Sequence, residues 1–309
     1  NLYHEASWGA LTERGYLWGV FIWNMFDFCS DSRREGDLTD INDKGLVSYD
    51  RQTRKDAFYF YRANWSTHPT LHLVGRRYTD RPYAVLDVKA YSNAPQARLW
   101  LNGSDQGVAP CVGGICLWRS VRLVPGRNEL RASAEVAGSI VSDSLQWTFS
   151  GSPAIVRIKA GDMSGYVSRD NQRYGSDMYF SAGDGRGANP PDTPPDKRIA
   201  VAADDPRLYG SFREGEFSYR VPVPNGRYRI VLKFAEPSAG AAAERVFDVD
   251  VGGATVLKSF DVFAAAGDKL KGVDRAFDAT ASDGNLQIAF RPLKGKALVS
   301  ALAITPLDR

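Results

Sequence analysis

The few histidines and cysteines in this sequence limit the catalytic and metal-binding chemistry that the chain can carry out. The 309 residues include three histidines, at His4, His68 and His72. Because none follows His72, the later residues cannot form a histidine-dependent catalytic triad or a multi-histidine metal site. Cys111 and Cys116 are five residues apart, a spacing at which a hairpin either closes a disulfide or keeps two thiols. The third cysteine, Cys29, is expected to be a buried thiol.

The charge balance and the hydropathy pattern exclude two classes of partner. Lys and Arg together number 39 and Asp and Glu 36, a net charge of +3, with no dense basic segment. Nucleic acids and anionic membrane surfaces are therefore not expected partners. No apolar run reaches the roughly 18 to 20 residues of a membrane-spanning helix. Aromatic residues are the strongest compositional signal, with 7 Trp, 14 Tyr and 15 Phe.

The first 66 residues predict a helix, a strand and a second helix. Apolar residues at helical spacing predict one helix over residues 2–14 and another over residues 55–65. Between them, residues 16–28 are almost continuously apolar and rich in aromatic and β-branched side chains. Such a run suits a strand covered on both faces, as in a parallel sheet with helices outside. One helix and one strand cannot supply that cover, so we expect this segment to be the edge of a longer protein.

Five separated motifs lie in this part of the chain. They are Tyr16-Leu17-Trp18-Gly19-Val20-Phe21-Ile22-Trp23-Asn24-Met25-Phe26-Asp27-Phe28, Glu35-Gly36-Asp37, Asn42-Asp43-Lys44-Gly45-Leu46-Val47, Asp50-Arg51 and Lys55-Asp56-Ala57-Phe58-Tyr59-Phe60-Tyr61. In this order they resemble the end of the catalytic domain of glycoside hydrolase family 2 β-galactosidases. The resemblance implies that residues 1–66 are the last β/α unit of a (β/α)8 barrel, whose site lies at the C-terminal ends of the strands.

This resemblance implies a sugar site and the absence of the catalytic pair. Trp23 is implied as a platform for a sugar face, with Asp27 and Lys44 lining the same pocket; alternatively, Trp23 fills the barrel core and Lys44 is only solvated. The family hydrolyses β-galactosides with retention, using two glutamates that lie upstream of this strand. We therefore expect no catalytic residue, no cofactor and no metal in this chain, and no activity from it alone. The glutamates near its start are interpreted as solvated charges; they are Glu5, Glu13 and Glu35.

Residues 67–150 change to short alternating runs separated by turn signals. The strand-like runs lie at residues 85–91, 97–101, 117–121, 128–132 and 143–147. This density of short strands predicts an immunoglobulin-like β-sandwich. The runs Leu99-Trp100-Leu101-Asn102-Gly103 and Pro125-Gly126-Arg127-Asn128 resemble the accessory sandwich that follows the barrel in the same hydrolase family. A structural spacer is the role that we expect for it.

Residues 151–309 give a second all-β pattern. Strands are expected at residues 155–159, 217–223, 228–235, 245–251, 254–261, 286–290 and 301–304. Motifs such as Ser176-Asp177-Met178-Tyr179-Phe180 and Leu208-Tyr209-Gly210-Ser211-Phe212-Arg213 resemble the malectin-like carbohydrate-binding fold. Its ligand lies among aromatic rings and an acidic residue in loops at one end of the sandwich. The resemblance implies sugar-binding roles for Tyr174, Tyr179, Tyr209, Arg213 and Asp261. The alternatives are core packing for the tyrosines and turn stabilisation for Asp261.

The sequence thus predicts a mainly β chain in three parts. These are the incomplete barrel end at residues 1–66, the immunoglobulin-like sandwich at 67–150 and the malectin-like domain at 151–309. The leading hypothesis is the C-terminal part of a retaining β-galactosidase-like hydrolase; the alternative is a non-catalytic module that binds carbohydrate or assembles the enzyme. Expected partners are an oligo- or polysaccharide and the missing N-terminal part of the same enzyme, and a homo-oligomer stays open. Export to the periplasm or the exterior is expected.

Overall fold

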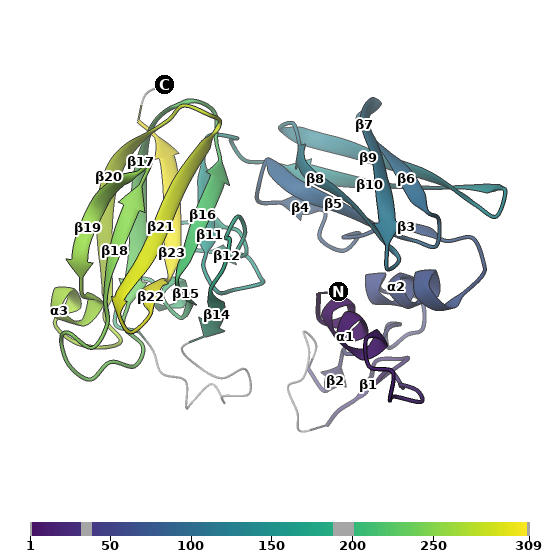
Figure 1. Ribbon diagram of the computed structural model, residues 1–309, viewed down its shortest axis with the longest axis horizontal. Coiled ribbons are helices and arrows are strands. Elements are labelled where there is room, and N and C mark those ends of the chain that lie inside the picture. The colour runs from purple at the N-terminus through teal and green to yellow at the C-terminus, as the bar shows by residue number, and fades with distance from the viewer. Residues whose placement is uncertain (1, 32–38, 188–200, 308–309) are drawn as a thin grey trace. The chain divides into compact units, whose positions relative to one another are not determined.

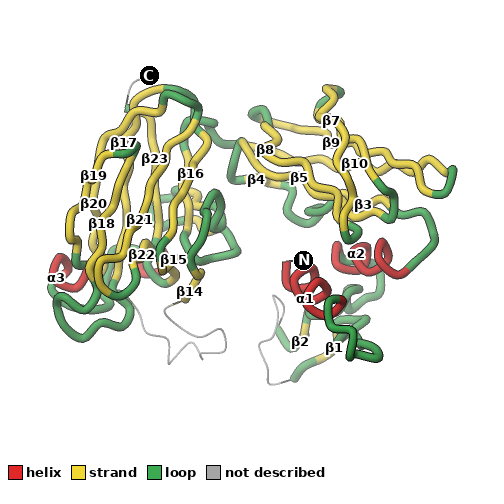
Figure 2. The backbone as a smooth tube through the Cα atoms, in the orientation of Figure 1, coloured by secondary structure: helices red, strands yellow, loops and turns green. Residues whose placement is uncertain are grey.

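The computed structural model describes residues 2–31, 39–187 and 201–307, which divide into two compact units (Figure 1). The first unit comprises Asn1–Arg81 and Val85–Phe149, and the second comprises Pro82–Ala84 and Ser150–Arg309. Strands dominate both units, and helices are few (Figure 2). None of the described helices combines the length and the apolar character needed to cross a lipid bilayer.

Two helices at the start of the first unit pack against each other and against its β-sandwich. They are α1 (Leu2–Thr12) and α2 (Asp56–Trp65), as the sequence predicted. His4 Nδ1 lies 3.0 Å from the hydroxyl of Tyr61 on α2. Glu5 accepts hydrogen bonds from Lys89 of the sandwich, at 2.6 and 2.8 Å. The interpretation of Glu5 as a solvated charge is therefore wrong, because its carboxylate pairs with a lysine.

The strand predicted over residues 16–28 is largely absent. Only β1 (Phe28–Cys29) forms there, paired with β2 (Ile41–Asn42). A strand needs backbone partners along its length, and the described residues supply them only near residues 24–29, where Leu46 N donates to Asn24 O at 3.1 Å. Cys29 is exposed and not buried as expected. Residues 16–23 form an exposed aromatic loop; its exposed aromatic side chains are Tyr16, Trp18, Phe21 and Trp23.

The remainder of the first unit is the predicted immunoglobulin-like sandwich. Its strands follow the order β3-β5-β8-β7-β6-β9-β10-β4, and β7 pairs with β6 along most of its length and with β8 at its end. That end carries the Cys111–Cys116 disulfide, which settles the open choice at these cysteines. The strands are β3 (Leu71–Leu73), β4 (Asp80–Arg81), β5 (Val85–Ser92), β6 (Gln96–Leu101), β7 (Ser104–Val112), β8 (Ile115–Arg122), β9 (Gly126–Val136) and β10 (Ser139–Phe149).

The second unit is a sandwich of two four-stranded sheets. One has the order β11-β23-β17-β20 and the other β16-β21-β18-β19, with a smaller β14-β15-β22 sheet and a β12-β13 pair beside them. The bounds are β11 (Val156–Lys159), β12 (Tyr166–Val167), β13 (Arg173–Tyr174), β14 (Asp184–Gly187), η2 (Pro206–Leu208), β15 (Ser211–Gly215), β16 (Phe217–Pro222), β17 (Gly226–Ala235), β18 (Val246–Val251), β19 (Ala254–Phe260), α3 (Val262–Ala266), β20 (Gly272–Ala281), β21 (Asn285–Lys294), β22 (Ala297–Val299) and β23 (Ala301–Pro306).

The two main sheets of this unit enclose one continuous apolar core. Burial alternates along β18, which places every second side chain inside, as expected for a strand with one covered face. Phe234 of β17 packs against Phe247 and Phe260 of the other sheet, at ring distances of 6.1 and 5.1 Å. The predicted sugar-binding residues lie outside these two sheets, on β13, on β15 and in loops.

Candidate functional site

Asp27 is the residue around which the predicted sugar site of the first unit is organised. Its carboxylate is buried, and Oδ1 lies 2.6 Å from Nζ of Lys55 and 2.9 Å from the backbone nitrogen of Gly45, which donates to it. Lys55 Nζ also donates to the carbonyl of Asp43 at 2.6 Å. The pair therefore ties the start of α2 to the segment that carries Lys44.

Trp23 and Lys44 lie on the two chain segments that meet at Asp27. The segments approach so closely that a Cβ on Gly45 would lie 2.1 Å from the Asp27 nitrogen, so only glycine fits there. Trp23 is 73% exposed, with its ring edge-on to Phe28 at 6.1 Å, and Lys44 is exposed as well. Asp27 is thus an internal anchor between the two segments, whereas Trp23 and Lys44 carry exposed side chains on one segment each.

A cavity of about 490 Å³ opens beside this anchor, a volume that suits a small ligand. Its lining residues are Asp27, Ile41, Asp43, Ser48, Tyr49, Asp50, Thr53, Lys55 and Arg77. Trp23 and Lys44 are not among them. Eight of these nine side chains carry a polar or charged group, but most of the surface that they present to the cavity is apolar. The residues described in the structure contain no group of three or more His, Cys, Asp or Glu side chains that could hold a metal ion.

In the second unit, Arg213 is part of a buried ion pair. Its guanidinium donates to Oδ2 of Asp177 through Nε at 2.9 Å, and its second terminal nitrogen lies 2.8 Å from the same oxygen. The hydroxyl of Tyr219 donates to the other oxygen of Asp177 at 2.8 Å. Arg213 also donates to the carbonyls of Ala182 and Gly183. Both charged side chains are at most 6% exposed, so we assign this group a structural role.

Tyr209 lies in a second small apolar cluster of this unit and reaches a polar pair at its edge. Its hydroxyl donates to Oδ1 of Asp274 at 2.6 Å, and Lys233 holds the other oxygen of that carboxylate at 2.6 Å. Lys233 and Asp274 are cross-strand neighbours on β17 and β20. Burial, together with the adjacent carboxylate of Asp274, raises the pKa of Tyr209. The side chain of Asp274 is 40% exposed, which leaves this pair accessible to a ligand.

The other three predicted sugar-binding residues lie apart from this pair. Tyr174 packs in the same apolar cluster as Tyr209, and burial raises its pKa to about 12. Tyr179 is partly buried against the main core, 5.2 Å from the ring of Tyr83. Asp261 caps α3, because its carboxylate accepts from the backbone nitrogen of Ala264 at 3.0 Å. The tyrosines thus pack as the alternative anticipated, and Asp261 stabilises a helix start.

Comparison with known proteins identifies the second unit. The family model for the malectin domain matches residues 154–305. This part of the chain is a malectin domain. Mouse malectin is 37% identical to the chain over 99 residues, which are 31% of the chain and 30% of that protein. The family-model match at residues 154–305 includes Asp177, Arg213, Tyr209 and the Lys233–Asp274 pair.

The chain as a whole resembles β-glucuronidases, and it spans only a fraction of their length. A β-glucuronidase of Bacteroides fragilis is 42% identical over 133 residues, which are 42% of this chain and 19% of that enzyme. The structure of Bacteroides uniformis β-glucuronidase 2, covalently bound to cyclophellitol-6-carboxylate aziridine, aligns with a TM-score of 0.51 at 23% identity, covering 99% of this chain and 38% of that one. At that identity the alignment shows a shared fold. The chain therefore shares its fold with part of a glycoside hydrolase, and a β-glucuronidase is among its relatives.

Several residues of these sites were not singled out from the sequence. Lys55 lies within a quoted motif, but nothing in its spacing shows that it pairs with Asp27, 28 residues earlier. Asp274 and Lys233 meet only because β17 and β20 are paired. The Glu35-Gly36-Asp37 motif lies outside the described residues. A lysine and an aspartate on opposite strands could have been matched only after the register was known.

Replacing Tyr209 by phenylalanine is expected to lower the free energy of unfolding of the malectin domain by about 1–2 kcal/mol at neutral pH, because one hydrogen bond to a carboxylate is lost. The raised pKa means that the folded state holds the neutral phenol, so its contribution is complete below pH of about 10 and is lost as the pH rises further. Denaturant unfolding of both proteins across that pH range should show a shallower alkaline loss in Tyr209→Phe. An unchanged alkaline slope would contradict this role.

Proposed function

We propose that this chain is the C-terminal part of a retaining glycoside hydrolase that acts on β-glucuronides, with a malectin domain that binds oligosaccharide. The observation that carries the proposal is the exposed aromatic loop at residues 16–23, which directly precedes the segment that holds the Asp27 anchor. The resemblance to β-glucuronidases supports the same assignment. The two catalytic carboxyl groups that a retaining mechanism needs would come from the upstream part of the protein.

The exposure of the aromatic loop supports the proposal that another part of the protein packs against it. Trp18 and Phe21 are each 91% exposed, and Tyr16 is 78% exposed, whereas monomeric proteins rarely expose large contiguous apolar patches. The rest of a (β/α)8 barrel would cover such a loop and would supply the strand partners that residues 16–23 lack among the described residues. In that setting Trp23 would remain at the mouth of the barrel, as a platform for a sugar ring.

Lys44 supports a glucuronide over the β-galactoside that the sequence predicted. A glucuronide carries a carboxylate at C6, where a galactoside carries a neutral hydroxymethyl group. An exposed ammonium group can pair with that carboxylate, and such charge-assisted bonds are stronger than neutral ones. Asn42, whose side-chain oxygen accepts from the Lys44 backbone nitrogen at 3.0 Å, holds the turn that presents the lysine.

The Lys44→Ala variant of the whole gene product is expected to lose about 10- to 100-fold in kcat/KM on 4-nitrophenyl β-glucuronide, the value of one charge-assisted hydrogen bond. Its kcat/KM on 4-nitrophenyl β-galactoside should change little. Lys258→Ala, at an exposed lysine of the malectin domain, is the matched control and should leave both substrates unaffected. Equal losses on both substrates would show that Lys44 does not read the carboxylate and would contradict the glucuronide assignment.

In the malectin domain, the proposed sugar contacts gather at Tyr209. The Lys233–Asp274 pair offers a donor and an acceptor to ring hydroxyls, and Tyr174 packs in the same apolar cluster as Tyr209. Tyr179 remains a candidate at a separate place, while Arg213 and Asp261 position loops. The proposal keeps three parts, at residues 1–66, 67–150 and 151–309. We also propose that the enzyme is exported and acts on oligo- or polysaccharides. Whether it self-associates is a matter for measurement.

A further inference from the structure

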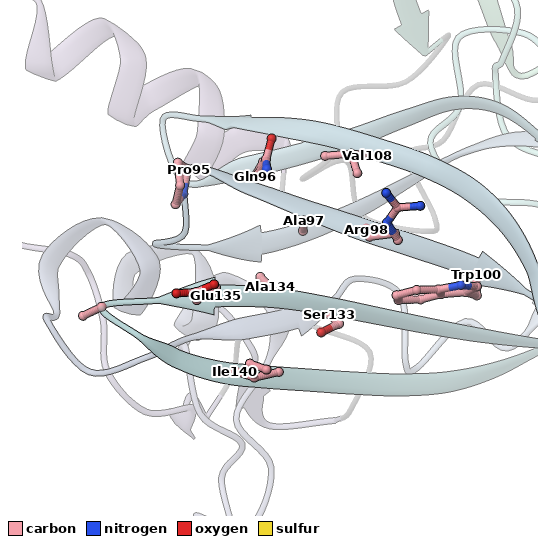
Figure 3. Close-up of a pocket in the computed structure, with 11 residues that line it drawn as sticks. Pro95, Gln96, Ala97, Arg98, Trp100, Val108, Ser133, Ala134, Glu135 and Ile140 are labelled. Carbon is pink, nitrogen blue, oxygen red and sulfur yellow. The ribbon is translucent and has the colours of Figure 1, made fainter.

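The immunoglobulin-like sandwich carries a groove that the proposed function does not use. The groove is open to solvent and has a volume of about 610 Å³, within the size range of small-ligand sites. Figure 3 shows its lining side chains spread along neighbouring strands, with Trp100 at one end and Pro95 at the other. The lining residues are Pro95, Gln96, Ala97, Arg98, Trp100, Val108, Ser133, Ala134, Glu135, Ala137 and Ile140.

The strands that form this groove cannot accept another strand. β6 is paired on one side with β7 and on the other with β9, and β9 is paired with β6 and β10. Their backbone donors and acceptors are therefore already used, and strand addition by an extended peptide is closed to this face. A ligand in the groove has to be held by side chains.

The side chains of the groove combine an aromatic ring with short polar groups. Arg98 lies opposite Ser133 across β6 and β9, and Trp100 is the next outward residue on the same strand. Gln96 and Glu135 supply an amide and a carboxylate toward the other end (Figure 3). An indole face packs against the C–H face of a pyranose, while amide, carboxylate and guanidinium groups bond to its hydroxyls.

The charge of the groove selects among carbohydrate classes. Arg98 and Glu135 are the two charged residues that line the groove, and their opposite charges cancel. Arg98 is additionally paired with Asp105, so no net positive field remains to attract a polyanion. Ile140 is 81% exposed at the rim and Val108 is 43% exposed, which adds apolar surface for sugar C–H groups. We propose that this groove is a binding site for a neutral oligosaccharide chain, with Trp100 as its stacking platform.

The test is a titration of the 309-residue chain, labelled with ¹⁵N, with cellotetraose, xylotetraose and β-1,4-galactotetraose. We expect at least one probe to bind saturably, with a Kd of about 1 mM or tighter, and to shift the backbone amides of Gln96, Arg98 and Ser133. Trp100→Ala should weaken that binding by about tenfold or more. Tyr78→Ala, at an exposed aromatic residue of the same unit outside the groove, is the control and should bind normally.

The same titration separates this site from the malectin domain. Shifts at Tyr209, Lys233 and Asp274 report on the proposed function, and shifts at the groove amides report on this inference, so either can fail alone. The inference is overturned if no probe shifts the groove amides, or if a folded Trp100→Ala binds as the wild type does. It is also overturned if the chain self-associates through this face, seen as a sedimentation change that Trp100→Ala abolishes. If Trp100→Ala does not fold, the shifts in the unaltered chain decide.

Discussion

The Asp177→Ala variant is expected to lower the free energy of unfolding of the malectin domain by about 3–5 kcal/mol, one of the two largest effects expected of a single substitution here. Removing the carboxylate leaves the Arg213 guanidinium buried without its counter-ion, and it takes the acceptor from the Tyr219 hydroxyl. In a domain of this size the loss corresponds to a fall in melting temperature of roughly 10 °C. Differential scanning calorimetry of the chain would resolve the transition of this domain.

The matched control is Asp278→Ala on β20. Asp278 pairs with Arg229, but both side chains are more than 40% exposed, so the pair is worth about 1 kcal/mol or less. A small loss in Asp278→Ala beside a large one in Asp177→Ala would establish that Arg213 holds the fold. Equal small losses would mean that the Arg213–Asp177 pair does not stabilise the fold. Arg213 would then again be a candidate for ligand binding.

The Asp27→Ala variant is expected to destabilise the first unit by about 3 kcal/mol, the second large effect. Lys55 is 10% exposed and would lose its only carboxylate partner described here, and the backbone nitrogen of Gly45 would lose its acceptor. Because Gly45 follows Lys44, the turn that presents Lys44 should loosen as well. Denaturant unfolding of the 309-residue chain, followed by near-ultraviolet circular dichroism, measures the loss.

A double variant shows whether the buried charge causes that loss. In Asp27→Ala combined with Lys55→Met, no unpaired ammonium group remains, so part of the stability should return. Arg119→Ala, which removes a 76% exposed guanidinium group that faces Asp87, is the surface control and should cost about 1 kcal/mol or less. A double variant less stable than Asp27→Ala alone would contradict the argument from unpaired charge.

Much of the fold could be predicted from local patterns. The strands of both sandwiches alternate buried and exposed residues with period two, and Asn102-Gly103 marks a hairpin, so their existence was readable. β20 was missed because its outward positions carry Asp274, Asp278 and other polar residues between small alanines, which weakens the apolar signal. The strand predicted over residues 16–28 is absent for most of its length. Its apolar composition indicates a buried environment, but a strand forms only where backbone partners are present.

The sites were harder to predict than the strands because their decisive contacts are between residues distant in sequence. The Arg213–Asp177 pair joins β15 to a loop 36 residues earlier, and Tyr209 reaches Asp274 across 65 residues. A motif names residue types and cannot tell a side chain that binds a ligand from one that binds its neighbour. Asp261 shows the same limit, since an aspartate before a short helix serves as a cap whether or not a ligand lies nearby.

The most direct test of the central claim is the substrate preference of the whole gene product that contains this chain. We expect it to hydrolyse 4-nitrophenyl β-glucuronide with a kcat/KM at least about tenfold above that for 4-nitrophenyl β-galactoside, since Lys44 pairs only with a carboxylate. Hydrolysis of neither substrate, or a clear preference for the galactoside, would contradict the account.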